Sequence, residues 1–311
     1  MKKYVVMFCF GCLAMVVKAE PIKILPAPQK LSEHVYAWIG PLDGPSEENR
    51  GFRMNMAFVV GHSAVAVIDT GYTSAMAEEM LAYIRAITPK PIRYAINTNS
   101  QPHRYFGNDV FREQGAEIIA HVNAVKRMNE MGGRFSTAVE NILKLKPSSL
   151  ALPKDPTKPI DADVALDLGG IEIVVRSVGP THTRSQLVVE ILSDNIIYAS
   201  DILYSGRLLA VLSDSDIINW LQAFRQLKRH EGVLMIPGHG QPEKITAFIK
   251  PTESYLLLLK THMLQAIDEM MDMQDAIDSL DQSAYSMLVN FEQLAGRNAS
   301  WAYVTLEAGN L

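Results

Sequence analysis

The chain has 311 residues, of which 48% are hydrophobic and 20% are charged, and its formal net charge at pH 7 is −5. This composition is typical of a globular protein and provides enough apolar residues for a large core. An acidic chain offers no electrostatic attraction for nucleic acid or anionic lipid, so we expect neither as a partner.

The first residues predict a secretory signal peptide over 1–19, followed by a single domain over 20–311. Lys2 and Lys3 form a positively charged start, an apolar run extends to Val17, and Val17-Lys18-Ala19 resembles a cleavage site. The apolar run is shorter than the ~20 residues of a transmembrane helix. We therefore expect a periplasmic or secreted protein without stable membrane insertion after cleavage; an uncleaved anchor is the alternative.

Removal of this segment would change the net charge from −5 to −8, because it contains three lysines and no acidic residue. Both cysteines, Cys9 and Cys12, also lie in it. The mature protein would then have no thiol, which excludes disulfide bonds, a cysteine nucleophile and cysteine metal ligands.

The remaining chain predicts two strand-rich halves, each followed by helices. In the first half we expect strands at 35–40, 57–61, 64–69, 92–97 and 116–120, and helices at 74–87, 105–114 and from about 122. A Pro-, Ser- and Lys-rich crossing at 146–160 leads to the second half. There we expect strands at 163–168, 171–177, 186–192, 195–200 and 233–238, and a helix at 216–229. This order predicts an α/β protein with an αββα sandwich, in which two facing sheets have helices outside them.

The last part of the chain, about 251–311, is expected to be a helical extension packed on the same domain. Apolar residues at helical spacing form one face of it: Leu256, Leu259, Met263, Ile267 and Met270. A similar stripe marks the helix at 74–87: Met76, Met80, Leu81, Ile84 and Ile87. At this spacing core packing is favoured over a ligand groove.

Polar residues gather at four predicted strand ends. These are the stretch NTNSQPHRYFGN at 97–108, the turn GPTHT at 179–183, Ala199-Ser200-Asp201, and the turn PGHG at 237–240. A histidine between Gly and Pro at a strand end has its ring free to face a cleft, which suits a metal ligand better than a core position. Several such turns together favour a functional site.

These residues resemble those of the metallo-β-lactamase-fold hydrolases. That family has an H-x-H-x-D-H motif, then a Gly-rich turn with a third histidine, an aspartate at a strand end and a Gly-His pair; here these positions fall at 99–104, His182, Asp201 and His239. The segments DTG at 69–71 and FGN at 106–108 match as well. Within the family, GPSEENRG at 44–51, HTRSQLVVEIL and GRNASWAYVTLE resemble exported zinc metallohydrolase-like proteins associated with quinoprotein relay and sulfur-oxidation systems.

The resemblance implies two metal sites, but the motif here is degenerate. The first site would be formed by Asn99, Gln101, His182 and Asp201, and the second by His103, Arg104, Asp201 and His239. Neutral amides are poor zinc ligands, and arginine has no lone pair to donate. We therefore expect no paired metal centre. The remaining metal-ligand candidates could hold one zinc, iron or manganese ion, or the site holds no metal: His103, His182, Asp201 and His239.

Two functions are consistent with this site, and both involve a small-molecule substrate or ligand, either anionic or polar. In the first, the protein is a mononuclear metal-dependent hydrolase of an ester, amide or thioester, with Asp201 and Arg104 as catalytic residues. In the second, it is a catalytically inactive ligand-binding or accessory protein, in which Arg104 pairs with Asp201 and replaces the metal charge. Iron-dependent oxygenase chemistry ranks last, because Asn99 occupies the third position of the required ligand set.

The other polar candidates are expected to have structural roles. Asp69 is predicted to hold loop backbone near the site, and His121 to cap the helix that follows it. The remaining histidines are expected in turns or on polar faces: His34, His62, His230 and His262.

Overall fold

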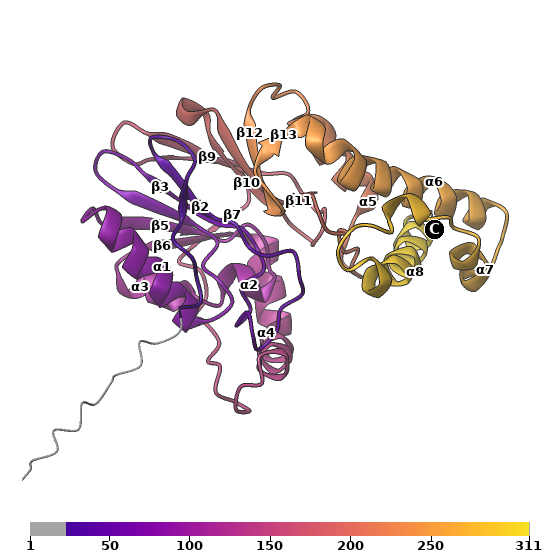
Figure 1. The fold of residues 1–311 in the computed structure, drawn as a ribbon, viewed down its shortest axis with the longest axis horizontal. Coiled ribbons are helices and arrows are strands. Elements are labelled where there is room, and N and C mark those ends of the chain that lie inside the picture. The colour runs from indigo at the N-terminus through magenta and orange to yellow at the C-terminus, as the bar shows by residue number, and fades with distance from the viewer. Residues whose placement is uncertain (1–22, 311) are drawn as a thin grey trace, which may run out of the picture.

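A computed structural model describes residues 23–310, so the predicted signal peptide, with Cys9 and Cys12, lies outside the described residues. Figure 1 shows two sheets between two groups of helices, with α1 to α4 on one side and α5 to α8 on the other. The predicted αββα sandwich is confirmed.

The first sheet has seven strands in sequence order. They are β1 (Gln29–Lys30), β2 (Val35–Trp38), β3 (Met56–Val60), β4 (Val65–Ile68), β5 (Ile92–Ile96), β6 (Glu117–His121) and β7 (Lys158–Ile160). The strands pair antiparallel from β1 to β4 and parallel from β4 to β7. The helices of this half are α1 (Ser74–Ile87), α2 (Pro102–Tyr105), α3 (Asn108–Glu113) and α4 (Val122–Ile142).

The second sheet has six strands in the order β13-β12-β11-β10-β9-β8. They are β8 (Val164–Asp167), β9 (Glu172–Ser177), β10 (Leu187–Ile191), β11 (Ile196–Tyr204), β12 (Leu234–His239) and β13 (Glu243–Lys244). Of these pairs, β11 and β12 are parallel and the others antiparallel. The helices are α5 (Ile217–Leu227), α6 (Tyr255–Asp268), α7 (Met273–Asp278) and α8 (Phe291–Asn310), and a π-helical turn (Ile249–Ser254) leads into α6.

Three buried layers hold the sandwich together. Alternate residues of both sheets meet in the middle layer, which includes Ile96, Val189 and Ile236. The apolar faces of α1, α3 and α4 cover the outer face of the first sheet. The faces of α5, α6 and α8 cover the second sheet. The C-terminal helices therefore share a core with β11 and β12 and are part of the same body.

Two predicted elements have different boundaries in the structure. The helix expected at 105–114 is divided at Gly107, where a Cβ atom would lie 2.1 Å from the carbonyl oxygen of Thr70. The strand expected at 195–200 continues to Tyr204, with a register shift at Ser200. Asp201 therefore lies inside a bulged strand and not at its end.

The two apolar stripes pack on the core except at their last residues, with Leu81 and Ile267 half-buried. Leu256, Leu259 and Met263 belong to the core, but Met270 lies beyond the end of α6 and is 91% exposed. Ile87, the last residue of α1, is 40% exposed. Both exceptions occur where the helix leaves the sheet that it covers.

Candidate functional site

The predicted site lies at one edge of the sandwich, where β4, β5, β11 and β12 meet loops. Two residues there, Asp69 (φ 59°) and Ser200 (φ 50°), adopt the left-handed conformation that side chains other than glycine rarely adopt. Such strained residues persist only when their surroundings hold them, and they concentrate at functional sites. Ser200 forms the bulge that precedes Asp201.

The turn after β12 is pressed against Asp201. A Cβ atom on Gly238 would lie 2.1 Å from Asp201 Oδ1, so only glycine allows the backbone to approach this closely. Asn55 holds the turn: its backbone N–H donates to Gly238 O at 3.0 Å, and its side-chain amide donates to Pro237 O and Gly240 O at 2.9 and 2.8 Å.

Arg104 is fully buried at the centre of the site. Its Nε and Nη2 donate to the two carboxylate oxygens of Asp201, at 3.1 and 2.7 Å. Its Nη1 donates to Asp69 Oδ2 at 2.9 Å, to Asn55 O at 2.9 Å and to Tyr198 OH at 3.2 Å. A bidentate guanidinium–carboxylate pair is the strongest kind of charge-assisted hydrogen bonding in proteins.

The charges of this cluster stabilise each other. Burial alone would raise the pKa of Asp201, but the Arg104 guanidinium holds it well below its usual value. Burial raises the pKa of Asp69 to about 6 although Arg104 opposes this shift. Burial would lower the pKa of Arg104, but Asp201 and Asp69 raise it. Arg104 and Asp201 therefore form a permanent ion pair.

Asn99 and Gln101 adopt different roles at the predicted ligand positions. The Asn99 amide donates to Asp201 Oδ2 at 2.8 Å and to Gln186 Oε1 at 3.2 Å. Its oxygen accepts the backbone N–H of Gln101 at 2.9 Å. Asn99 thus adds a further donor to Asp201, whereas the Gln101 side chain lines the nearby pocket.

The three predicted histidine ligands lie near Asp201 but do not surround one point. His239 Nε2 lies 3.6 Å from Asp201 Oδ1, and the His103 ring lies 6.2 Å from the His239 ring. Tyr204 stacks on His239 at 5.1 Å and lies 6.0 Å from His182, so its phenol stands beside both. Tyr204 OH donates to Asp201 Oδ1 at 3.2 Å.

All three histidines are buried and are neutral at pH 7. Burial is the main cause: it lowers the pKa of His182 to about 4 and the pKa values of His103 and His239 well below the usual value. His182 Nδ1–H donates to Ala210 O and His239 Nδ1–H donates to Arg53 O, each at 2.8 Å. In both rings Nε2 is therefore the nitrogen with a lone pair.

The donor set of the site does not fit a metal ion. Both oxygens of Asp201 already accept N–H groups of the Arg104 guanidinium, which stays protonated and positively charged. Across residues 23–310 no three His, Cys, Asp or Glu side chains are arranged to hold a metal. The assignment of His103, His182, Asp201 and His239 as metal ligands stays a prediction.

A pocket of about 320 Å³ opens beside this cluster. His182, Tyr204 and His239 form its inner wall, and the C-terminal segment closes it with Asn290 and Arg297. Its described lining includes three arginines and no acidic residue: Arg53, Arg207 and Arg297. On a chain of net charge −5 this pocket is locally basic.

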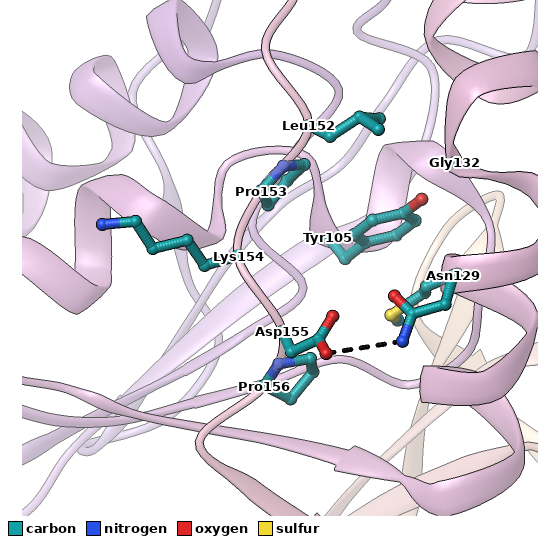
Figure 2. A pocket seen from close by; sticks show the side chains of 9 residues that line it. Tyr105, Asn129, Gly132, Leu152, Pro153, Lys154, Asp155 and Pro156 are labelled. Atoms are coloured by element: carbon teal, nitrogen blue, oxygen red, sulfur yellow. Dashed lines mark hydrogen bonds between the residues drawn. The ribbon is translucent and has the colours of Figure 1, made fainter.

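Figure 2 shows another pocket, of about 120 Å³, between α4 and the segment 152–156. Asn129 donates to Asp155 across it at 3.4 Å, and Lys154 points away from it. The described residues around it include no histidine and no arginine. The basic pocket next to Asp201 is therefore the better candidate for ligand binding.

The minor predictions are largely confirmed. Asp69 accepts the backbone N–H of Thr98 at 2.9 Å, and His121 Nδ1 accepts the N–H of Asn123 at 3.1 Å at the start of α4. His62 is exposed and His34 is paired with Asp194 near the surface. His121 itself is buried and not on a solvated face as expected.

Asp69, which was predicted only to hold backbone, also pairs with Arg104. Several other residues of the site have no recognisable signal in the sequence. One is Tyr198, which donates to Asp69 at 2.9 Å. Arg53 and Arg207 lie in loops outside any motif. Tyr204 alone could have been suspected, since it follows Asp201 by three residues next to a strand end.

The fold is shared with known proteins. A metallo-β-lactamase from Pontibacter korlensis superposes with a TM-score of 0.61 at 18% identity, covering 74% of this chain and 98% of that one. DIM-1 metallo-β-lactamase gives 0.57 at 17% identity, with 74% and 97% covered. TMB-1 gives 0.56 at 17% identity, with 73% and 94% covered. At these identities the likeness concerns the fold alone.

Two facing mixed sheets with helices on both outer sides define an αββα sandwich. The family model of the metallo-β-lactamase superfamily matches residues 50–239, and the chain belongs to this superfamily. The match includes Arg53, the 99–104 stretch, His182, Asp201, Arg207 and His239. The helices after β12 lie outside it. No helix among residues 23–310 combines the length and apolar character needed to span a membrane.

Proposed function

We propose that this protein binds a small polar molecule in the pocket beside Asp201 and does not carry out hydrolysis with a metal-bound hydroxide. The observation that supports this is the bidentate pair between Arg104 and Asp201, in which both side chains are 0% exposed. Arg104 supplies there the positive charge that metal ions supply in a hydrolytic member of the superfamily. The superfamily acts on small molecules, which agrees with a pocket of about 320 Å³.

Metal binding would require Asp201 to exchange its guanidinium for the ion. That exchange would leave a buried arginine with one carboxylate partner, Asp69, and breaking a buried ion pair costs about 3–5 kcal/mol. The amide of Asn99 would also lose its carboxylate acceptor. The two bonds from Arg104 and the one from Asn99 to Asp201 therefore favour the metal-free arrangement.

One observation favours a second candidate, a hydrolase with a single metal ion. His182 and His239 each donate Nδ1–H to a backbone carbonyl, which is the arrangement that orients Nε2 toward a metal in many metalloproteins. For either activity we also propose a location outside the cytoplasm, which the predicted signal peptide and the subgroup resemblance support.

Metal analysis and hydrolysis assays of the mature protein distinguish the two candidates. We expect wild type to retain far less than one equivalent of zinc, iron or manganese after supplementation and dialysis, and to cleave an activated ester no faster in metal than in chelator. Arg104→His should gain metal affinity. Arg104→Lys should not, because lysine keeps the positive charge although it lacks the paired N–H donors of a guanidinium. Stoichiometric metal in wild type with chelator-sensitive turnover would establish the hydrolase.

A further inference from the structure

Two arginines line the pocket with buried N–H groups that have no partner: Arg207 is buried as a whole and Arg53 is half-buried. Arg207 is 4% exposed, and its Nε and Nη1 atoms are buried with no hydrogen-bond acceptor. The Nε atom of Arg53 is in the same condition. Neither arginine takes part in an ion pair within residues 23–310. Because a buried charge without a partner costs free energy, such a pair of groups calls for an acceptor from outside the chain.

The described carboxylates near these arginines form no ion pair with them. Asp201 attracts both, and Asp43 attracts Arg207 more weakly. Asp201 already accepts two N–H groups from Arg104, one from Asn99 and one O–H from Tyr204. The described residues lining the pocket include no acid. Burial, and then the positive charge of Arg53, lower the pKa of Arg207 to about 10, so it remains charged at pH 7.

The backbone holds the two arginines in fixed places. The carbonyl of Arg53 accepts Nδ1–H of His239 at 2.8 Å, next to the Asn55 bonds that tie this loop to the turn after β12. Arg207 forms a parallel bridge with Val289, where Leu208 N–H donates to Val289 O at 3.0 Å. A site whose donors are fixed before binding loses little entropy when the ligand arrives.

The segment outside the family match completes the pocket. Asn290, the residue before α8, and Arg297, in the second turn of α8, line it. Asn298 ties α8 to the loop after β11: its amide donates to Leu209 O at 2.7 Å and its oxygen accepts Val211 N–H at 2.8 Å. Arg297 is exposed at the rim, where a third positive charge attracts an anion.

We propose that Arg53 and Arg207 bind the oxyanion group of a small organic molecule in this pocket, with Arg297 at its entrance. A guanidinium presents several N–H donors in a plane that matches the oxygens of carboxylate and phosphate groups. Arg104 is enclosed by Asp69 and Asp201 and does not line the pocket, so recognition of the anion belongs to the other two arginines. The inference rests on the ligand-binding role proposed above and adds the class of its ligand.

Thermal unfolding of the mature protein with added anions tests the proposal. The probes are inorganic phosphate and succinate, compared with chloride at equal ionic strength. We expect at least one oxyanion to raise Tm by about 5 °C at a hundredfold excess over its dissociation constant. A response to succinate alone indicates a carboxylate ligand, and a response to phosphate alone indicates a phosphoryl ligand. Equal Tm values in all three salts would overturn the proposal.

Arg207→Met separates a binding role from a structural one. The substitution removes a buried unpaired charge, so the variant without anion should be at least as stable as wild type, and its response to the oxyanion should be lost. Arg53→Met should also lose the response. Arg134→Met, at an exposed position of α4, is the matched control and should respond as wild type does. A less stable Arg207→Met with an unchanged anion response would contradict the inference.

The outcome is independent of the metal test. If wild type binds metal, and if Arg207→Met abolishes the oxyanion response that wild type shows, the metal-free function fails and the anion site stands. If wild type is free of metal and no oxyanion changes its Tm, the anion site fails and the metal-free function stands.

Discussion

Asp69 and Asp201 share one guanidinium group. Asp69 follows β4 of the first sheet and Asp201 lies on β11 of the second, and Arg104 donates to both, at 2.9 Å and at 2.7 Å. Tyr198, also on β11, donates to Asp69 at 2.9 Å. One buried cation therefore joins the two halves of the sandwich at the edge where the pocket opens.

Arg104→Met should destabilise the protein strongly, because it leaves two buried carboxylates without a cation. The expected loss is about 3–5 kcal/mol in the free energy of unfolding. Urea unfolding monitored by the fluorescence of the tryptophans measures it. Arg104→Met combined with Asp201→Asn should recover part of the loss, since one uncompensated charge disappears. A loss below about 1 kcal/mol for the single variant would mean that the pair is not buried as described.

Gly238→Ala should disturb the site by steric overlap alone. The added Cβ would lie 2.1 Å from Asp201 Oδ1, so either the turn or the carboxylate has to move. We expect a loss of about 1–3 kcal/mol, typical of overpacking in a dense interior. Gly296→Ala is the control: its Cβ meets nothing within 4 Å on α8, and the change should stabilise the helix by up to about 1 kcal/mol. Equal effects of the two substitutions would contradict the close approach.

The sequence predicts the fold well because periodicity reports on burial. Most strands and helices of both halves agree with the prediction within a few residues, but the short strands β1, β7 and β13 were not predicted. Both stripes pack on the core, with Ile87 and Met270 exposed at their ends. The boundaries that differ depend on tertiary contacts. Gly107 divides a helix because the chain passes against Thr70, and Ser200 forms a bulge because β12 shifts its register.

The site was predictable only where residues form a pattern along the chain. The 99–104 stretch, His182, Asp201 and His239 were found from turns and resemblance, and the structure brings them to one edge. Arg53 and Arg207 were not found, because a lone arginine in a loop is ordinarily solvated. Their significance depends on burial without an acceptor, which no spacing reveals.

Asn298→Ala should show that α8 supports the pocket. The Asn298 side chain is 0% exposed and bonds both Leu209 O and Val211 N–H, which would lose their partner. Leaving buried backbone groups unsatisfied costs about 1–3 kcal/mol each, so unfolding should become easier by a similar amount. Differential scanning calorimetry, with and without oxyanion, measures both stability and response. Asn129→Ala, at an exposed position of α4, should change neither.

The buried histidines should make the protein sensitive to mild acid. A histidine whose pKa is lowered by folding stays neutral in the native state, whereas the unfolded chain takes up a proton near pH 6.5. For His182, with its pKa near 4, stability is therefore lost as pH falls from about 6.5 to about 4, by up to about 1.4 kcal/mol per pH unit. Asp69 acts in the opposite direction, since its pKa near 6 exceeds the unfolded value of 3.8.

His103 and His239, whose pKa values are also lowered by burial, take up protons on unfolding as His182 does. The proton that Asp69 releases on unfolding offsets the uptake by only about one histidine, so acid destabilises the protein on balance. We expect the free energy of unfolding to decrease steadily from about pH 7 to about pH 5, measured by urea titration at each pH. His182→Gln should flatten this decrease, since one proton fewer is taken up on unfolding. His62→Gln, at an exposed position, should leave the curve parallel to wild type. A pH profile that is flat in wild type would show that these imidazoles are not held neutral by burial.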